Sequence, residues 1–198
     1  MPETSSLFAQ APHWARQPFS VPRPLPAKVK SWLYETGSLT QRLRAYYGAQ
    51  FAVRILQQRW HKAFIDESRL LLLPASQYVL IREVLLHAAG QPLILARSII
   101  PANTIAVAQR NLSHLGTRPL GEVIFAYPDL QRLALELAYI QPSSWQTHSR
   151  RQFALDQPLW GRRTVYAIPT QPLLVSELFL PGVLDIPGIA QPRLQTSK

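Results

Sequence analysis

The sequence predicts a single α+β domain with a roughly six-stranded antiparallel sheet and several helices. Two pairs of apolar runs, rich in Val, Ile and Leu and each joined by a short proline-containing turn, occupy residues 78–100 and 162–180. This pattern is typical of β-hairpins. Helix-like segments cluster between the hairpins, which favours an antiparallel sheet. The chain has 198 residues, a usual length for one domain, and 47% of them are hydrophobic, which suffices for a normal core.

The chain begins with a proline-rich arm and continues with two helices. Residues 1–26 contain prolines at a density that interrupts helix and sheet hydrogen bonding, so an irregular or disordered arm is expected. Residues 27–34 resemble a helix. Ser38 is a plausible N-cap for a second helix that runs through Tyr46 and ends at Gly48. The two helices could bind DNA, but short helices joined by a glycine turn are far more often packing units.

A strand and the central hairpin follow. Residues 50–62 alternate between two faces as a strand does. Residues 70–74 are an apolar run within a loop. The strands of the central hairpin are predicted at residues 78–87 and 93–100, joined by an Ala-Ala-Gly-Gln-Pro connection.

The middle of the chain is predicted to be helical. Asn103 or Thr104 can cap a helix that Gly116 ends. Residues 117–121 form a turn, and residues 122–126 form one more helical turn.

The last third returns to strands. Residues 130–140 have a helix-like composition, but their apolar side chains alternate strictly, and we predict a strand. Residues 141–157 are polar and form a long surface connection. The final hairpin has strands at residues 162–168 and 173–180, and a proline ends its second strand. The tail is again rich in proline and irregular.

The charge and composition narrow the choice of partners. The net charge is +10 and the pI is about 10.5, which suits nucleic acid, an anionic membrane surface or anionic small ligands. The basic residues are scattered and no nucleic-acid-binding signature is present, so no nucleic-acid partner is expected. The absence of cysteine excludes disulfides and thiolate chemistry. No apolar run reaches about 18 residues, and no signal-peptide pattern is visible. We therefore expect a cytoplasmic protein without stable membrane insertion.

Two charged residues lie inside otherwise apolar strands. Arg82 shares its strand face with apolar residues, whereas the adjacent Glu83 points to the other face. A buried arginine cannot lose its charge and needs an anion from the protein or from a ligand. Glu177 is a lone carboxylate in the run LLVSELFL. Arg82 and Glu177 could form an internal ion pair, or both could face one cavity, where Arg82 binds a substrate carboxylate and Glu177 handles a hydroxyl or a proton.

Arg97 is a third candidate, with a structural role slightly favoured over ligand binding. With a hairpin loop of four or five residues, Arg97 lies opposite Arg82 and Glu83. A cross-strand pair with Glu83 would contribute less than about 1 kcal/mol if it were exposed.

Cofactor and metal sites have no support in the sequence. The histidines are isolated, and no paired-ligand spacing is present. Glycine-rich nucleotide loops and nucleophile elbows are also missing. We therefore expect a site without cofactor or metal, built from a buried arginine and a buried glutamate.

Five segments taken together resemble chorismate pyruvate-lyases, bacterial enzymes that make 4-hydroxybenzoate for ubiquinone synthesis. The segments are YVLIREVLL (78–86), RSIIP (97–101), LGTRPLG (115–121), LWGRR (159–163) and PLLVSELFLP (172–181). The resemblance implies a six-stranded antiparallel sheet with an enclosed ligand site beneath two helical flaps.

The resemblance also implies a division of the chain. Residues 1–31 are a proline-rich arm with the start of the first helix. Residues 32–181 are the chorismate lyase-like domain, and residues 182–198 are an irregular tail. The arm, residues 143–153 and the tail look like additions to the family pattern. A monomer is expected.

The family's ligand contacts fall on four residues. The resemblance implies that Arg82 holds the ring carboxylate, that Glu177 meets the 4-hydroxyl and that Leu120 makes a backbone contact. A methionine contact in a flap helix of the family falls on Leu39, and this departure should alter packing more than chemistry because the two side chains have similar volumes.

The implied reaction is the elimination of the enolpyruvyl ether of chorismate with loss of the C4 proton and aromatisation of the ring. Chorismate is a dianion and suits a basic protein. Orientation and one acid–base group can suffice, without a cofactor. The alternative is a non-catalytic ligand-sensing domain, because effector domains of some bacterial transcription regulators resemble the same fold. Such domains normally follow a DNA-binding module, for which residues 1–31 are too short and proline-rich.

Overall fold

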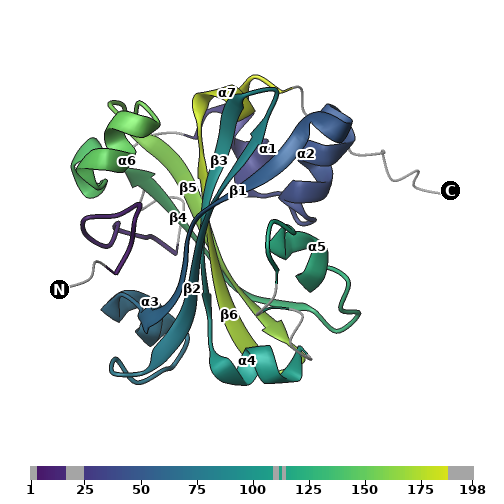
Figure 1. Ribbon diagram of the computed structural model, residues 1–198, viewed down its shortest axis with the longest axis vertical. Helices are drawn as coiled ribbons and strands as arrows, with labels where there is room; N and C mark the ends of the chain where they lie inside the picture. The colour runs from purple at the N-terminus through teal and green to yellow at the C-terminus, as the bar shows by residue number, and fades with distance from the viewer. Residues whose placement is uncertain (1–3, 17–24, 109–111, 113–114, 187–198) are drawn as a thin grey trace, which may run out of the picture.

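The computed structural model describes residues 4–16, 25–108, 112 and 115–186. Six strands form one antiparallel sheet in the order β1-β2-β3-β6-β5-β4 (Figure 1). This confirms the predicted α+β class with six antiparallel strands. The strands are Phe51–Lys62 (β1), Tyr78–Ala88 (β2), Gln91–Ile100 (β3), Gln131–Ile140 (β4), Leu159–Ile168 (β5) and Gln171–Phe179 (β6).

The two predicted hairpins, β2-β3 and β5-β6, lie side by side because β3 pairs with β6. The β2-β3 turn is only Ala89-Gly90, with positive φ values of 50° and 78°, and is shorter than the predicted connection. A bulge follows in the ladder, so that Glu83 still pairs with Arg97, as a longer loop would predict. The charged residues singled out in the sequence therefore lie in the centre of the sheet.

Within the described ranges, three helices cover one face of the sheet (Figure 1): α1 (Ala27–Leu33), α2 (Leu39–Tyr47) and α5 (Leu120–Ile124). The prediction of α1 and α2 is confirmed. The Ser38 side chain accepts a hydrogen bond from the Gln41 N–H at 3.3 Å, and Gly48 follows the last turn with a φ of 55°. Helix α5 begins two residues earlier than predicted, directly after Pro119.

The other face is covered by the N-terminal arm, α3 (Ile65–Leu70), a 3-10 turn (Pro142–Ser144) and α6 (Thr147–Gln152) (Figure 1). The described part of the arm is irregular, as predicted, but it is packed: Leu7 and Phe8 are buried, and Phe8 stacks on Trp145 with ring centroids 4.8 Å apart. Residues 141–157 are likewise more than a surface connection, since Trp145 is buried. Helices α3 and α6 were too short, at six residues each, for a periodic signal.

Helices α4 (Ala102–Val107) and α7 (Pro181–Leu184) lie at opposite ends of the sheet (Figure 1). The N-cap of α4 is Pro101, not Asn103 or Thr104. Both residues lie inside the helix, where the Thr104 hydroxyl donates to the carbonyl oxygen of Pro172 at 2.6 Å instead of capping. Helix α4 ends at Val107 with Ala108 as its C-cap, so the prediction of one helix that runs on to Gly116 is wrong. Residues 109–111 and 113–114 lie outside the described residues, as does most of the tail.

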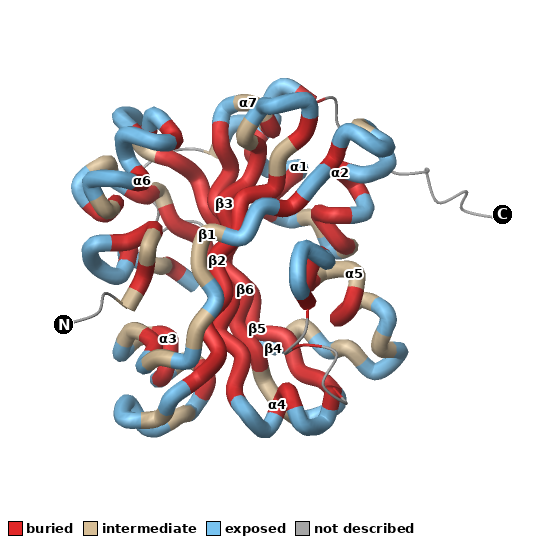
Figure 2. The backbone as a smooth tube through the Cα atoms, in the orientation of Figure 1, coloured by how far each residue is buried: buried red, intermediate tan, exposed pale blue. Residues whose placement is uncertain are grey.

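The sheet is the buried middle layer of the protein. Figure 2 shows burial along most of the central strands and exposure on the outer surfaces of helices and turns. Every residue of β5 is buried. In the part of the chain described, no helix is long and apolar enough to cross a membrane. Charged side chains on the central strands therefore need partners or a ligand within the protein.

Candidate active site

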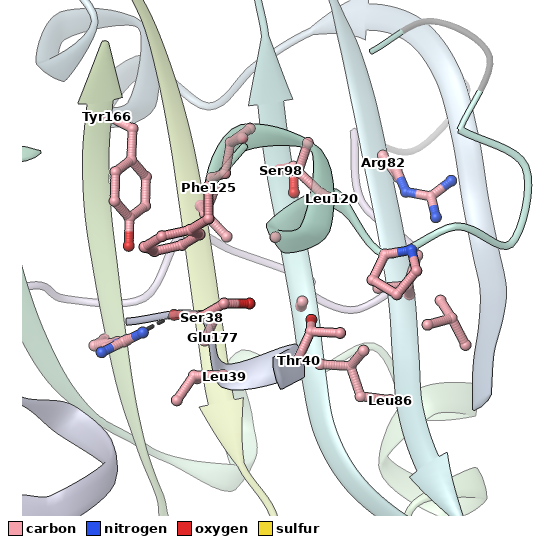
Figure 3. Close-up of a pocket in the computed structure, with 18 residues that line it drawn as sticks. Ser38, Leu39, Thr40, Arg82, Leu86, Ser98, Leu120, Phe125, Tyr166 and Glu177 are labelled. Atoms are coloured by element: carbon pink, nitrogen blue, oxygen red, sulfur yellow. Dashed lines mark hydrogen bonds and ion pairs between the residues drawn. The ribbon is translucent and has the colours of Figure 1, made fainter. Parts of the chain in front are cut away.

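A pocket lies between the sheet and the helices α2 and α5 (Figure 3). The empty space within it, counted together with the part open to solvent, is about 550 Å³. Most of the lining is apolar, as in typical small-molecule sites. The sheet contributes a small set of polar side chains: Arg82, Ser98, Arg162, Tyr166 and Glu177.

The register of the strands brings these side chains to one face. Arg82 on β2 pairs with Ser98 on β3, and Glu177 on β6 pairs with Ala96 on one side and Arg162 on the other. Directly paired residues project to the same face of a sheet. Arg82 and Glu177 thus line the same pocket from strands separated only by β3.

Arg82 is buried in the pocket wall, and no carboxylate of the described residues pairs with it. It is 1% exposed, and burial lowers its pKa below the usual arginine value. Nη1 donates to Oε1 of Gln58 at 2.7 Å and to the Gly116 carbonyl at 2.9 Å, and Nη2 donates to the Arg118 carbonyl at 3.2 Å. None of the described residues accepts a hydrogen bond from Nε. Nε thus has no acceptor among the described residues and Nη2 has one contact at 3.2 Å, so a ligand carboxylate can bind in bidentate geometry along this edge.

Glu177 pairs with Arg162, so the interpretation of an Arg82–Glu177 ion pair is wrong. Arg162 Nε donates to Oε2 of Glu177 at 2.6 Å. Burial, the largest single influence, disfavours the charge of Arg162, but the combined effects of Glu177, Tyr166 and Glu35 outweigh it and raise the arginine pKa. No donor among the described residues contacts Oε1, and the Glu177 side chain is 13% exposed, so this oxygen can face a ligand. Nη1 of Arg162 is fixed by the backbone carbonyls of Trp32, Leu33 and Glu35.

Arg97 belongs to the opposite face of the sheet. Nη1 donates to Oε1 of Glu83 at 2.7 Å, which confirms the predicted pair, although the pair is buried and not exposed. Nε and Nη2 also contact both carboxylate oxygens of Glu67 on α3 at 2.8 Å, a partner that the sequence did not indicate. Burial disfavours the Arg97 charge, but the two carboxylates more than offset this and raise the arginine pKa. Arg97 is fully paired and does not line the pocket.

Helices α2 and α5 cover the pocket. Leu39 and Leu120, the first residues of these helices, both line it. The helices meet at Gly121, where a Cβ atom would come within 2.9 Å of the Ser38 hydroxyl oxygen. An ion pair of 2.7 Å also joins the two helices. The cover is therefore closely packed over the ligand space.

Ser98 and Tyr166 are polar lining residues that the sequence pattern does not single out. The Ser98 hydroxyl has no hydrogen-bond partner among the residues described and points into the pocket (Figure 3). The Tyr166 ring packs edge-on against Phe125 at a centroid distance of 5.8 Å, and its hydroxyl accepts a hydrogen bond from Arg132 Nη2 at 3.4 Å. Burial and, after it, the charge of Glu177 raise the pKa of Tyr166, so the phenol is neutral at pH 7.

The arrangement suits a compact anionic ligand. Arg82 lies on one side of the pocket and Glu177 and Tyr166 lie on the other, with apolar side chains between them (Figure 3). The described His, Asp and Glu side chains form no group that could hold a metal ion. The chemistry available is carboxylate binding at Arg82 and proton transfer at Glu177.

Known sequences match nearly the whole chain. Residues 13–187 match the family model described as chorismate lyase. A probable chorismate pyruvate-lyase of Methylococcus capsulatus is 45% identical over 162 residues, which cover 82% of this chain and 100% of that protein. A probable chorismate pyruvate-lyase of Aromatoleum aromaticum is 38% identical over 179 residues, covering 88% of this chain and 95% of that protein.

Solved structures share the fold at low identity. The effector domain of PhnF from Mycobacterium smegmatis has a TM-score of 0.54 and 15% identity, and the match covers 75% of this chain and 91% of that domain. A GntR-family transcriptional regulator from Bacillus cereus has a TM-score of 0.54 and 13% identity, with 72% and 100% covered. These likenesses concern the fold alone.

Proposed function

The chain belongs to the chorismate lyase family, and we propose that it converts chorismate into 4-hydroxybenzoate and pyruvate, as the first step of ubiquinone biosynthesis in the cytoplasm. The bond between ring C3 and the ether oxygen breaks, and C4 loses its proton. The electron pair of the C4–H bond completes the aromatic ring. The electrons of the C3–O bond leave with enolpyruvate, which takes up a proton and becomes pyruvate.

Arg82 is the residue that we assign to the ring carboxylate. The observation that carries this proposal is a buried guanidinium that has, among the described residues, no acceptor for Nε and no carboxylate partner. A bound carboxylate would supply the missing counter-charge in bidentate geometry. Every other buried arginine of β3 and β5 already has a carboxylate partner.

Glu177 is assigned to proton transfer between C4 and the departing enolpyruvyl group. Arg162 holds Oε2 of Glu177 at 2.6 Å and leaves Oε1 facing the pocket. A carboxylate fixed in this way can accept the C4 proton beside the 4-hydroxyl and return it to enolpyruvate. Aromatisation provides much of the driving force, so correct orientation and this one acid–base group can suffice.

The two helices of the cover supply the remaining contacts. We assign a backbone contact to Leu120, because the first N–H groups of a helix have no partner within the helix. Leu39 is assigned an apolar contact with the ligand. Enclosure beneath α2 and α5 should hold the product tightly and make release limit turnover.

The proposed reaction needs no cofactor. Chorismate and the two products have the same summed composition, so no external oxidant or reductant takes part. The ligand set consists of the substrate chorismate and the product 4-hydroxybenzoate. Independence from metals and organic cofactors is a testable part of the proposal.

A second candidate function is ligand sensing without catalysis. It is the alternative to test because the fold is shared with the effector domain of PhnF and with a GntR-family regulator. Against it, the relatives matched over nearly their full length are named probable chorismate pyruvate-lyases. A sensing domain would bind chorismate or 4-hydroxybenzoate saturably and leave chorismate intact.

The deciding experiment mixes purified, metal-stripped protein with chorismate and follows both products by chromatography. We expect equimolar 4-hydroxybenzoate and pyruvate from the wild type and from an Arg151→Ala control, which changes an exposed arginine away from the pocket. Arg82→Ala should lose this activity. Binding without turnover would favour the sensor, neither binding nor turnover would exclude both functions, and activity that returns only with added metal would refute cofactor independence.

A further inference from the structure

The enolpyruvyl carboxylate of chorismate has no counterpart among the contacts assigned so far. Chorismate carries one carboxylate on its ring and a second on the enolpyruvyl group attached at C3. Arg82 is assigned to the first, while Arg162 and Glu177 neutralise each other. An unpaired carboxylate in a closed pocket is strongly unfavourable. A further donor or cation should therefore face the enolpyruvyl group.

Tyr166 lies where such a donor is needed. Its side chain lines the pocket on the side of Glu177, across the space from Arg82 (Figure 3). Tyr166 and Arg162 are four residues apart on β5 and therefore project to the same face. The Tyr166 hydroxyl points along the pocket toward the level of Glu177 (Figure 3). The Tyr166 hydroxyl would therefore point toward a substituent next to C4 of the substrate ring.

Arg132 orients this hydroxyl and places a positive charge behind it. Arg132 Nη2 donates to Tyr166 Oη at 3.4 Å and to the carbonyls of Glu35 and Thr36 at 3.1 Å each. The guanidinium carbon lies 5.7 Å from the Tyr166 ring centroid. No Asp or Glu among the described residues forms an ion pair with Arg132. Because the phenol oxygen accepts from Arg132 and finds no acceptor among the described side chains, its own proton is free for a ligand.

We propose that the Tyr166 hydroxyl, oriented by Arg132, donates a hydrogen bond to the carboxylate of the enolpyruvyl group. This inference rests on the proposed function. Arg82 and Arg132 then supply one positive charge for each carboxylate of the dianion. The Tyr166 contact leaves with pyruvate, and 4-hydroxybenzoate keeps only the contacts to its ring carboxylate and hydroxyl. Tyr166 therefore distinguishes substrate from product.

The test compares two ligands that differ in the enolpyruvyl group. One is 4-hydroxybenzoate, and the other is 4-hydroxy-3-(1-carboxyvinyloxy)benzoate, whose ring is already aromatic and cannot undergo the elimination. Calorimetry measures the affinity of both for the wild type, for Tyr166→Phe and for Tyr127→Phe. Tyr127 is a matched control because its hydroxyl donates to the Ala108 carbonyl at 3.1 Å and does not line the pocket.

Tyr166→Phe should lower the affinity for the dicarboxylate about tenfold or more, as expected for loss of one hydrogen bond to a charged group. The affinity for 4-hydroxybenzoate should stay within about twofold of the wild-type value. Tyr127→Phe should change neither affinity. Arg132→Met should repeat the selective loss, because it removes the charge behind the phenol. In turnover, Tyr166→Phe should raise KM for chorismate more than it lowers kcat.

The enolpyruvyl subsite would be overturned if Tyr166→Phe lowered the affinity for both ligands equally, lowered neither affinity, or lowered kcat alone. Turnover by the wild type would still leave the proposed function standing. A wild type that neither converts chorismate nor binds 4-hydroxybenzoate would overturn the proposed function itself, and the subsite with it.

Discussion

Replacing the two buried arginines of the β2-β3 hairpin one at a time should separate ligand binding from stability. The partners of Arg82 are Gln58 and the carbonyls of Gly116 and Arg118, all from exposed residues, so water can replace the guanidinium. Arg82→Met also removes a buried charge that no described carboxylate balances. We expect the free energy of unfolding of the ligand-free protein to change by no more than about 1 kcal/mol, since the lost hydrogen bonds and the relieved desolvation oppose each other.

Arg97→Met should have the opposite consequence. Its partners Glu83 and Glu67 are 0% and 4% exposed, so water cannot easily replace the lost cation. Breaking a buried ion pair costs about 3–5 kcal/mol. For a chain of this length, such a loss lowers the melting temperature by about 6–20 °C.

Two assays on each variant separate these effects. Urea and thermal unfolding without ligand measure stability, and calorimetry with 4-hydroxybenzoate measures binding. Arg82→Met should weaken 4-hydroxybenzoate about ten- to hundredfold, the range for a charge-assisted hydrogen bond. A destabilisation by Arg82→Met as large as that by Arg97→Met, or unchanged affinity in Arg82→Met, would refute the reasoning.

Three further substitutions address the base, the cover and a titrating group. Glu177→Gln should lower single-turnover conversion of chorismate at least about 100-fold and keep much of the affinity for 4-hydroxybenzoate; unchanged conversion would exclude the proton-transfer role. Gly121→Ala places a Cβ within 2.9 Å of the Ser38 hydroxyl oxygen, so stopped-flow measurements should show faster product release, and an unaltered rate would contradict a closely packed cover. The pKa of Tyr166 is raised above its ordinary value of about 10, so the folded state binds this proton more tightly than the unfolded state. The free energy of unfolding should therefore fall as pH rises from about 10 toward the folded-state pKa; Tyr166→Phe should lack this loss, and identical pH profiles would contradict it.

The sequence predicts the sheet well because the information for it is local. Paired apolar runs with turn residues define the β2-β3 and β5-β6 hairpins. The predicted pairing of Glu83 with Arg97 is also correct, although a two-residue turn and a bulge produce it in place of the longer loop expected. The packing of the arm was not predictable in the same way. Prolines show where backbone hydrogen bonds are missing, but not that Leu7 and Phe8 would be buried or that Phe8 would stack on Trp145.

From the sequence, only those pocket residues could be predicted that are unusual for the strand in which they lie. Arg82 and Glu177 stand out because each is a charge within an apolar strand. Arg162, the partner of Glu177, does not stand out in the sequence because both polar and apolar residues follow it. The register that pairs Arg162 with Glu177 is set by the turn between β5 and β6 and by packing. The polar character of Ser98 and Tyr166 is ordinary for strands, and only the pairing of β3 with β6 brings their strands to one pocket.

Adjacent residues of β2 carry the contrast on which the proposed function depends. On one face, Glu83 accepts from Arg97 and also from the Ser5 hydroxyl and the Ser6 N–H of the arm, so a buried charge cluster is satisfied within the protein. On the other face, the contacts that Arg82 makes with the described residues are all to neutral oxygen atoms. A ligand carboxylate at Arg82 would balance the buried charge on this face, as the protein's own residues balance the charges on the other. Because such a ligand binds the folded state and not the unfolded chain, 4-hydroxybenzoate should raise the stability of the wild type by mass action and should have little effect on Arg82→Met.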